Sequence, residues 1–424
     1  MRRWPRHCPP SRLRPRVHSR RSFQSEPSPL PPTAAATDES VTVECGSSGS
    51  FTVDLHDVSR HHPSTPLVIY LPPFSPAPGT RPVVPRFLRR YPTAVFNYRW
   101  RHPDSDPTPA ATPAPAPGEH DFSTPLQWPT PIHDVLAGYH WVAANLRPEA
   151  NARRDLYVYS SHAGASLAAS LALTESHCHE RVAVRGLVAW NGIFDWSMFL
   201  PDHRVNRPAS TKSRKLPPGP EEGTALRMLQ DQVGDLFRRP ADLLDPFASA
   251  VLFFRTPGML APSTFTQALA LTTLIDSMSS LTPGGRPVDL LSSLAATTAP
   301  RRSALNFPPR KSTLKLPATL LLHDAPPART RRRTKTTTTW RSRTGGGHTF
   351  EAQALELAGL MRRSLEKLEF KRRAEWDEDF DADEEGRRRV GVRCVEGDGD
   401  GDGLELGARG EEVAGAWLEE RIRL

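Results

Sequence analysis

The chain has 424 residues, of which 38% are hydrophobic, so it can bury one sizeable core. Its formal net charge of +8 comes from arginine-rich segments and not from a basic face interleaved with aromatic side chains, so nucleic-acid binding is not expected. No apolar run approaches the roughly 20 residues that span a bilayer, and the four cysteines are scattered without metal-ligand spacing. We therefore expect one large domain with no transmembrane segment, no metal and no cofactor.

The N-terminal segment, residues 1–37, is basic and rich in proline, and we expect it to be disordered. Its first 25 residues contain eight arginines and no acid, a composition typical of mitochondrial transit peptides. Prolines such as Pro5 and Pro15 would interrupt the amphipathic helix that such peptides form. Mitochondrial import and a cytoplasmic protein with a basic tail both stay open.

The elements predicted next are strands and one helix. Residues 40–55 alternate apolar and polar side chains around a Gly-Ser-Ser-Gly turn, which indicates a β-hairpin. The run 67–71 is wholly apolar, as in strands buried on both faces, and it leads into Pro72-Pro73-Phe74. Residues 93–100 predict a further strand, and residues 131–145 have the apolar spacing of a helix.

The central stretch of the chain is residues 155–175. Residues 156–159 are bulky strand formers, whereas residues 165–173 are small or straight-chain residues that favour a helix. Between them the turn 160–164 consists of small residues except for His162. A strand that enters a helix through a sharp turn requires small side chains, so this stretch predicts a tight strand-turn-helix unit.

Further strands and a helix are expected in the second half of the chain. Residues 185–192 predict a strand that ends near Asn191, where ligand-contacting residues gather at the C-terminal edge of a parallel sheet. Residues 221–238 have the pattern of an amphipathic helix. Residues 316–322 form an apolar strand that leads directly to Asp324.

The C-terminal part is highly charged. Residues 350–376 predict a long helix with charged pairs four residues apart. The remaining residues, 377–424, are acidic and glycine-rich, with a strand expected at 390–394 and a helix at 411–423. We assign this segment as an extension outside the main domain, and we interpret its acidic run as a solvated surface.

The unit 155–175 resembles the nucleophile elbow, Gly-x-Ser-x-Gly, of the α/β-hydrolases. Aligning Gly164 with the second glycine places Ser160 on the first and His162 at the nucleophile. An imidazole cannot form the usual ester intermediate. Shifting the alignment by one residue makes Ser161 the nucleophile, with Tyr159 and a following alanine at the glycine positions.

Weaker motifs resemble the esterase and lipase branch that includes hormone-sensitive-lipase-like enzymes. The pair Tyr98-Arg99 and the Pro-x-x-Asp opening that ends at Asp134 both match segments of that branch. The loop Pro72-Pro73-Phe74 stands where those enzymes carry His-Gly-Gly and an oxyanion-binding amide. Because Pro73 has no N–H group, the resemblance implies that this part of the machinery is altered.

The resemblance also implies positions for the other two members of a catalytic triad. Asp324 follows its strand sooner than the catalytic acid of these enzymes usually does. Pro326 stands near the usual position of that acid. His348 lies in a Gly-x-x-His-x-Phe context that matches the catalytic histidine. The order nucleophile, acid and histidine is kept along the chain. A ligand would lie near Pro72, Pro73, Phe74 and Asn191.

The fold class expected from these features is α/β, an α/β-hydrolase-like and mostly parallel sheet flanked by helices, with a cap insertion and disordered loops. The predicted main domain covers residues 38–376 and carries a cap at 201–257. Three low-complexity insertions are expected at 101–118, 204–219 and 328–347. The extension covers residues 377–424.

Three functions are consistent with the sequence. The first is a catalytically degenerate hydrolase relative that binds an apolar or acyl-like ligand or a protein partner, because His162, Pro73 and Pro326 fall on functional positions. The second is an active carboxylic-ester hydrolase that uses Ser161 with Asp324 and His348. The third is a non-enzymatic interaction scaffold in which charged and proline-rich segments recruit partners.

Overall fold

The computed structural model describes residues 38–75, 80–101, 126–149, 151–200, 203–206, 219–220, 222, 224–256, 304–324, 348–395 and 405–423. The N-terminal segment 1–37, Pro326 and the insertion 328–347 lie outside the described residues, as do most of the insertions 101–118 and 204–219.

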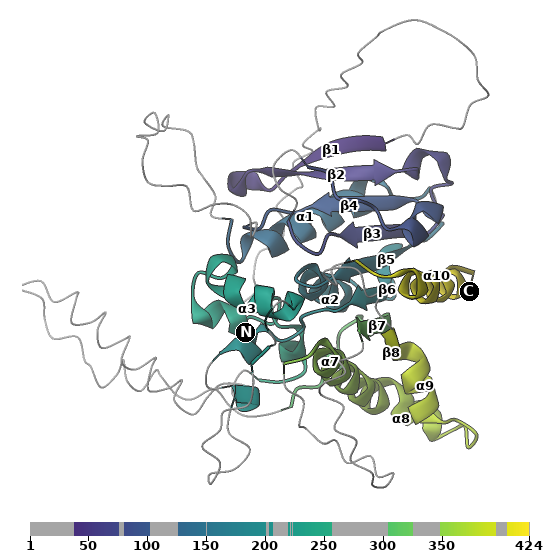
Figure 1. Ribbon diagram of the computed structural model, residues 1–424. Helices are drawn as coiled ribbons and strands as arrows, with labels where there is room; N and C mark the ends of the chain where they lie inside the picture. Colours follow the sequence, from purple (N-terminus) through teal and green to yellow (C-terminus); the bar gives the residue numbers. More distant parts are fainter. Residues whose placement is uncertain are drawn as a thin grey trace, which may run out of the picture. The chain divides into compact units, whose positions relative to one another are not determined.

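Eight strands form one sheet within the described residues (Figure 1). They are β1 (Asp38–Glu44), β2 (Ser50–His56), β3 (Leu67–Leu71), β4 (Thr93–Asn97), β5 (Arg154–Ser161), β6 (Val182–Trp190), β7 (Ala318–Asp324) and β8 (Val390–Val395). Their order across the sheet is β1-β2-β4-β3-β5-β6-β7-β8. The first three pair antiparallel, and all pairs from β4 to β8 are parallel, so the sheet is mostly parallel as predicted.

The strands follow the predicted patterns closely. The hairpin of β1 and β2 turns at a Gly-Ser-Ser-Gly stretch whose two glycines, Gly46 and Gly49, have positive φ angles of 61° and 84°. Strand β3 is buried at every residue, which is what its unbroken apolar run predicts. The edge hairpin instead alternates, with Val53 buried and Thr52 exposed.

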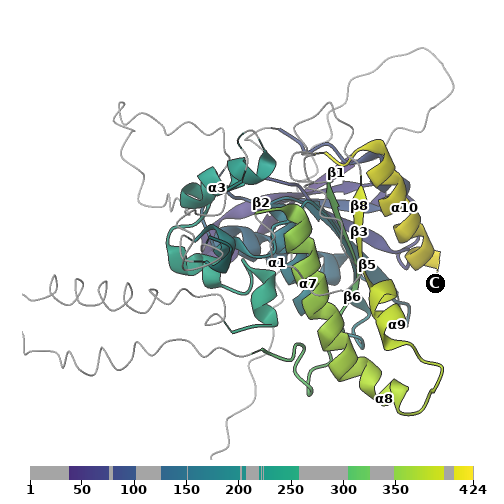
Figure 2. The same cartoon turned by 60° about the horizontal axis from the view of Figure 1, so that its bottom comes forward.

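Helices cover both faces of the sheet (Figure 2). They are α1 (Thr130–Asn145), α2 (Gly164–Thr174), α3 (Ala225–Leu236), α7 (Phe350–Leu365), α8 (Lys371–Ala374), α9 (Ala382–Arg389) and α10 (Ala408–Arg423). The apolar sides of α1, α2 and α7 share one buried cluster with one face of the sheet, and α10 packs against the other. No helix among the described residues is long and apolar enough to cross a membrane.

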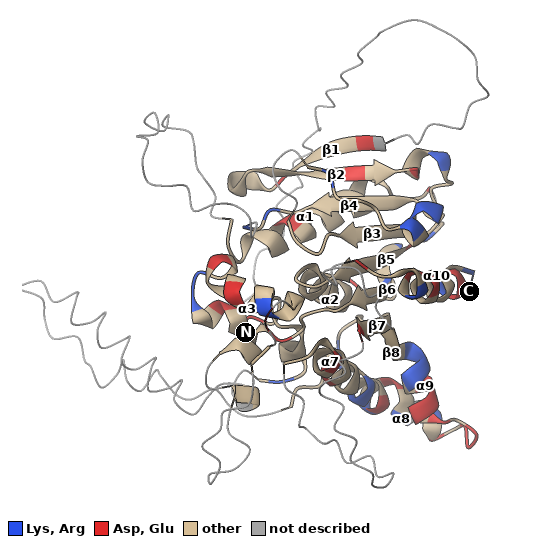
Figure 3. Cartoon of the chain, viewed as in Figure 1, with Lys and Arg blue, Asp and Glu red and all other residues tan. Residues whose placement is uncertain are grey.

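The segment 377–424 was predicted to lie outside the main domain, but its strand and its last helix pack as parts of that domain. Strand β8 pairs with β7 as the last strand of the sheet, and Trp417 of α10 packs edge-on against Tyr157 of β5 at a ring distance of 6.4 Å. The charged pattern of this segment conceals its role because only Val390 and Val395 of β8 are buried. Figure 3 shows the charges gathered on α9 and the turn before it, whereas the central strands are almost uncharged.

The long helix predicted for residues 350–376 is interrupted. Helix α7 passes into a π-helical turn, Glu366–Phe370, before α8 ends at Ala374. Phe370 of this turn packs against Phe380 at a ring distance of 5.4 Å. The turn therefore aims an aromatic side chain at the segment that returns to α9.

Two weak sequence motifs meet in space. Arg99, just after β4, donates through Nε and Nη2 to the two carboxylate oxygens of Asp134 in α1, at 2.9 and 2.7 Å. The backbone N–H of Arg99 also donates to Asp134 at 2.9 Å. Asp134 is fully buried, so this bidentate pair holds the first helix against the sheet.

Candidate functional site

The predicted sharp turn lies between β5 and α2. Strand β5 ends at Ser161, α2 begins at Gly164, and His162 between them has a φ of 50°. A side chain other than glycine in this left-handed region is strained by about 1–3 kcal/mol and is held there by its surroundings. Here the N–H of His162 donates to the carbonyl of Trp190 at 3.1 Å, and its own carbonyl accepts from Ile193 at 3.2 Å.

The close approach of the loop after β3 explains the small residues of this turn. A Cβ atom on Gly164 would lie 2.2 Å from the carbonyl oxygen of Pro72 and 2.5 Å from Oγ of Ser160. Oγ of Ser160 donates to the carbonyl of Leu71 at 2.7 Å. Gly164 and Ser160 are therefore small because the backbone after β3 occupies the space of a larger side chain.

The sheet order, the antiparallel start and the strained tip between β5 and α2 together decide the architecture. The chain has the α/β-hydrolase fold. The strained tip of this turn carries the imidazole of His162, the residue that the sequence alignment places at the nucleophile.

Comparison with solved structures finds esterases. An esterase from the archaeon Pyrobaculum calidifontis is 13% identical, with a TM-score of 0.43, and the match covers 91% of this chain and 82% of that one. Carboxyl esterase 2 of the fungus Tuber melanosporum is 14% identical, covering 95% and 89%, with a TM-score of 0.42. An esterase from Mycobacterium marinum is 14% identical, covering 92% and 82%, with a TM-score of 0.37. No protein-family model and no curated protein matches the sequence.

The imidazole of His162 is sealed inside the fold. It is 0% exposed, and it stacks on Phe74 of the loop after β3 at a ring distance of 6.2 Å. Phe350, the first residue of α7, packs edge-on against it at 5.5 Å. Aromatic contacts on both sides make the ring part of the packed core.

Ser161 lies on the other side of the sheet from the triad histidine. Side chains alternate along a strand, so Ser161 shares the face of Tyr157 and Tyr159, which is the face that α10 covers. His348 precedes α7, which packs on the opposite face. Among the described residues no hydrogen bond joins Ser161 to His348, and the active-hydrolase hypothesis needs one.

The ring nitrogen that a catalytic histidine uses as a base is occupied in His348. Nε2 of His348 lies 2.6 Å from Oδ1 of Asn206, whose amide group donates to the carbonyls of Met198 and Leu200. The Asn206 oxygen is thus an acceptor, and Nε2 must donate its proton to it. The ring also stacks on Phe199 at 6.1 Å, and Nδ1 has no hydrogen-bond partner within the described part of the chain.

Asp324 and Asn191 meet at the C-terminal edge of the sheet. The side-chain oxygen of Asn191 accepts from the N–H of Asp324 at 3.0 Å, and Asn191 has a positive φ of 44°. Burial raises the pKa of Asp324, although His323 and Asn191 act against this shift. No hydrogen bond between Asp324 and His348 occurs among the described residues, where Nδ1 of His348 has no partner.

The loop after β3 is held by its carbonyl groups. The carbonyl of Pro72 accepts from the hydroxyl of Tyr98 at 2.8 Å, and that of Pro73 accepts from the N–H of Gly164 at 3.1 Å. Pro72, Pro73, Phe74 and Ser161 line a pocket of about 640 Å³, which Asn191 does not reach. Among the described residues no cluster of three potential metal ligands occurs.

Sequence reasoning missed the two tyrosines that line the same pocket. Tyr70 of β3 and Tyr159 of β5 lie side by side in the sheet register. Strand alternation could have placed Tyr159 on one face with Ser161. The neighbouring position of Tyr70 could not be read from the sequence because 89 residues separate the two tyrosines.

Buried His348 should make folding stability depend on pH. Burial lowers the pKa of His348 below its usual value, so the unfolded chain binds its proton more readily than the folded one. The contribution of this group to the free energy of unfolding is therefore fully present above the unfolded pKa of about 6.5, and it is lost as the pH falls below that value. We expect His348→Gln to lose less stability than the wild type between about pH 7.5 and 5.5 in urea unfolding. The control is His133→Gln at an exposed position, which should show the same change of unfolding free energy with pH as the wild type. The same pH dependence in His348→Gln as in the wild type would contradict the prediction.

Proposed function

We propose that this chain is a catalytically degenerate relative of the esterases, which binds an apolar or acyl-like ligand and does not hydrolyse it. The observation that supports this most directly is the side chain at the elbow. The strained tip carries the buried imidazole of His162 where an attacking hydroxyl is needed.

The state of the other catalytic positions supports the same proposal. Nε2 of His348 donates to Asn206, so the ring nitrogen that a catalytic histidine uses as a base already carries a proton. Pro73 has no N–H group to stabilise an oxyanion. The pocket beside the loop after β3 is retained, with a volume of about 640 Å³, inside the roughly 300–1,000 Å³ of ligand sites.

The proposal predicts no ester turnover by the purified full-length chain. With p-nitrophenyl butyrate we expect no release of p-nitrophenol above the buffer rate, and a fluorophosphonate probe should leave the protein unlabelled. The alternative, an active esterase, predicts turnover and labelling that disappear in Ser161→Ala.

The matched control is Ser160→Ala. Ser160 is the neighbouring serine, but it is fully buried and its hydroxyl donates to Leu71, so it is closed to substrate. Turnover that survives Ser160→Ala and is lost in Ser161→Ala would refute the proposed loss of activity.

A further inference from the structure

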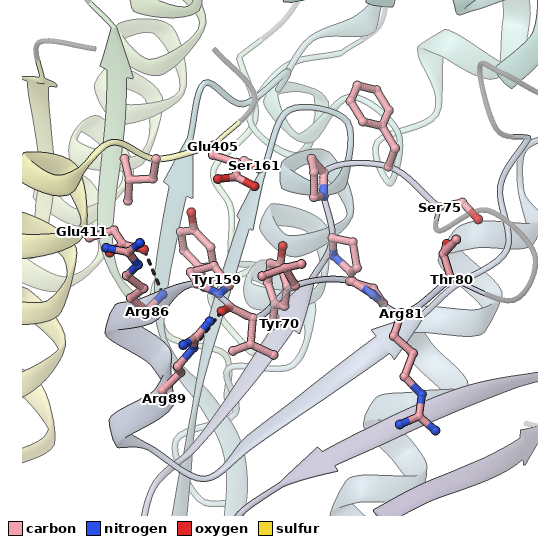
Figure 4. A pocket seen from close by; sticks show the side chains of 18 residues that line it. Tyr70, Ser75, Thr80, Arg81, Arg86, Arg89, Tyr159, Ser161, Glu405 and Glu411 are labelled. Atoms are coloured by element: carbon pink, nitrogen blue, oxygen red, sulfur yellow. Dashed lines mark hydrogen bonds between the residues drawn. The ribbon is translucent and has the colours of Figure 1, made fainter. Parts of the chain in front are cut away.

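The pocket lies where β3 and β5 end, on the face of the sheet that α10 covers (Figure 4). The loop after β3 forms one wall, and the residues that lead into α10 form another. Its entrance is therefore built partly by the C-terminal segment 405–411, which is distant in sequence from the elbow.

Three hydroxyl groups line the floor of this pocket. The rings of Tyr70 and Tyr159 stack at 5.6 Å with an angle of 26°, and Ser161 follows on the same face two residues after Tyr159. The three side chains are only 5%, 3% and 4% exposed. In Figure 4 both tyrosine hydroxyls point toward the side of the pocket where Ser161 and Glu405 lie.

None of these three hydroxyls has a hydrogen-bond partner among the described residues. None of the three oxygens is among the buried unpaired atoms of the described residues, so they are open to the volume of the pocket. A ligand that enters the pocket can therefore accept hydrogen bonds from the tyrosines.

The tyrosines are suited to donate. Burial raises the pKa of both Tyr70 and Tyr159, and the nearby carboxylate of Glu405 raises it further. Both side chains therefore keep their protons throughout the physiological range. A neutral phenol donates its single O–H to an acceptor such as a carbonyl oxygen.

The charges around the hydroxyls disfavour an anionic ligand. Glu405 places a negative charge close enough to influence both tyrosines. Arg81 points away from the pocket in Figure 4. Arg86 and Arg89 also line the pocket, but neither is among the charges that shift the pKa of Tyr70 or Tyr159. A carboxylate beside the tyrosines would thus meet repulsion from Glu405.

The rest of the lining combines apolar residues with the charged groups described above. Pro72, Pro73, Phe74, Val84 and Leu406 are among the apolar ones. Proline and aliphatic side chains offer contact area to a hydrocarbon chain and no side-chain hydrogen-bonding groups. The pocket thus offers a few hydroxyl donors and an apolar surface, both of which small-molecule sites use.

We propose that this pocket binds an uncharged acyl compound, an ester or an amide, whose carbonyl oxygen accepts hydrogen bonds from Tyr70 and Tyr159. Its apolar chain lies along Pro72, Pro73 and Phe74. This inference rests on the proposed function, because it names the class of ligand that the inactive fold retains.

The test compares hexanamide with hexanoate, two probes with the same chain length but a neutral or a charged head. Titrations of the full-length protein followed by ligand-observed NMR should show saturable binding of hexanamide and weaker binding of hexanoate. Removing one donor in Tyr70→Phe or Tyr159→Phe should weaken hexanamide binding about two- to tenfold, the value of one neutral hydrogen bond. Glu405→Gln should reduce the preference for hexanamide over hexanoate.

The control is Tyr91→Phe, because Tyr91 packs against the same face of the sheet but does not line the pocket. It should bind hexanamide like the wild type. Thermal unfolding of each variant checks that its fold is intact. Equal hexanamide affinity in folded Tyr70→Phe and Tyr159→Phe, tighter binding of hexanoate, or no saturable binding of hexanamide would overturn the inference. The loss of activity is judged separately, by ester turnover.

Discussion

Arg99→Ala is expected to lower the free energy of unfolding by about 3–5 kcal/mol, because it strands a buried carboxylate without its partner. Asp134 is 0% exposed and Arg99 is 20% exposed, and the two are joined by a bidentate contact with N···O distances of 2.9 and 2.7 Å. Cys45 also donates to Asp134 at 3.3 Å, but a thiol is a weak donor and cannot neutralise the charge. Urea unfolding at neutral pH measures the effect.

The control for this prediction is an exposed ion pair. Arg227 and Asp231 lie four residues apart on α3, 3.2 Å from each other, with side chains 40% and 60% exposed. Arg227→Ala should cost about 0–1 kcal/mol, because solvent screens such pairs. The double variant Arg99→Ala/Asp134→Ala should be less destabilised than the sum of its single variants. A cost for Arg99→Ala no larger than that for Arg227→Ala would show that the buried pair does not hold α1 to the sheet.

Gly164→Ala should destabilise the protein by about 3 kcal/mol, the upper end of the range for inserting one methyl group into a packed core. The new Cβ would lie 2.2 Å from the Pro72 carbonyl oxygen, a backbone atom that can move only if the loop after β3 moves. We also expect the displaced loop to widen the pocket, so that hexanamide binding weakens in the folded fraction. Thermal and urea unfolding measure the first effect.

Gly359→Ala is the matched control, the same chemical change in the middle of α7. A Cβ there meets no atom within 4 Å, so the change should stabilise the helix by about 0.5–1 kcal/mol. The two substitutions are thus expected to act with opposite sign. Equal effects, or a neutral Gly164→Ala, would contradict the close packing of the elbow against the loop.

Several parts of the fold could be predicted from the sequence because their signals are local. The apolar run of β3, the alternation in β1 and β2, and the change from bulky to small residues across β5 and α2 each describe neighbouring residues. The predicted turn at His162 was found at the predicted place, with the positive φ that an elbow requires. Chain order then sufficed to suggest the mostly parallel sheet.

The place of the C-terminal segment was predicted wrongly for a physical reason. Parallel strands pair across long connections, so nothing near residues 390–395 indicates that β8 lies beside β7. The strand is only partly buried, and its weak pattern does not distinguish an edge strand from an isolated one. Only the assembled sheet shows that α10 completes its second face.

The features of the candidate site also fall into two groups, those that the sequence determines and those that only the folded structure shows. By itself, the sequence determined that a histidine stands in the turn between β5 and α2, and that Pro73 in the loop after β3 has no N–H group. It could not determine that His348 donates to Asn206, that Ser161 faces α10, or that Tyr70 and Tyr159 place their hydroxyls together. Those relations depend on which strands are neighbours and which face each side chain takes. They arise from packing between residues far apart in the chain, which no local pattern encodes.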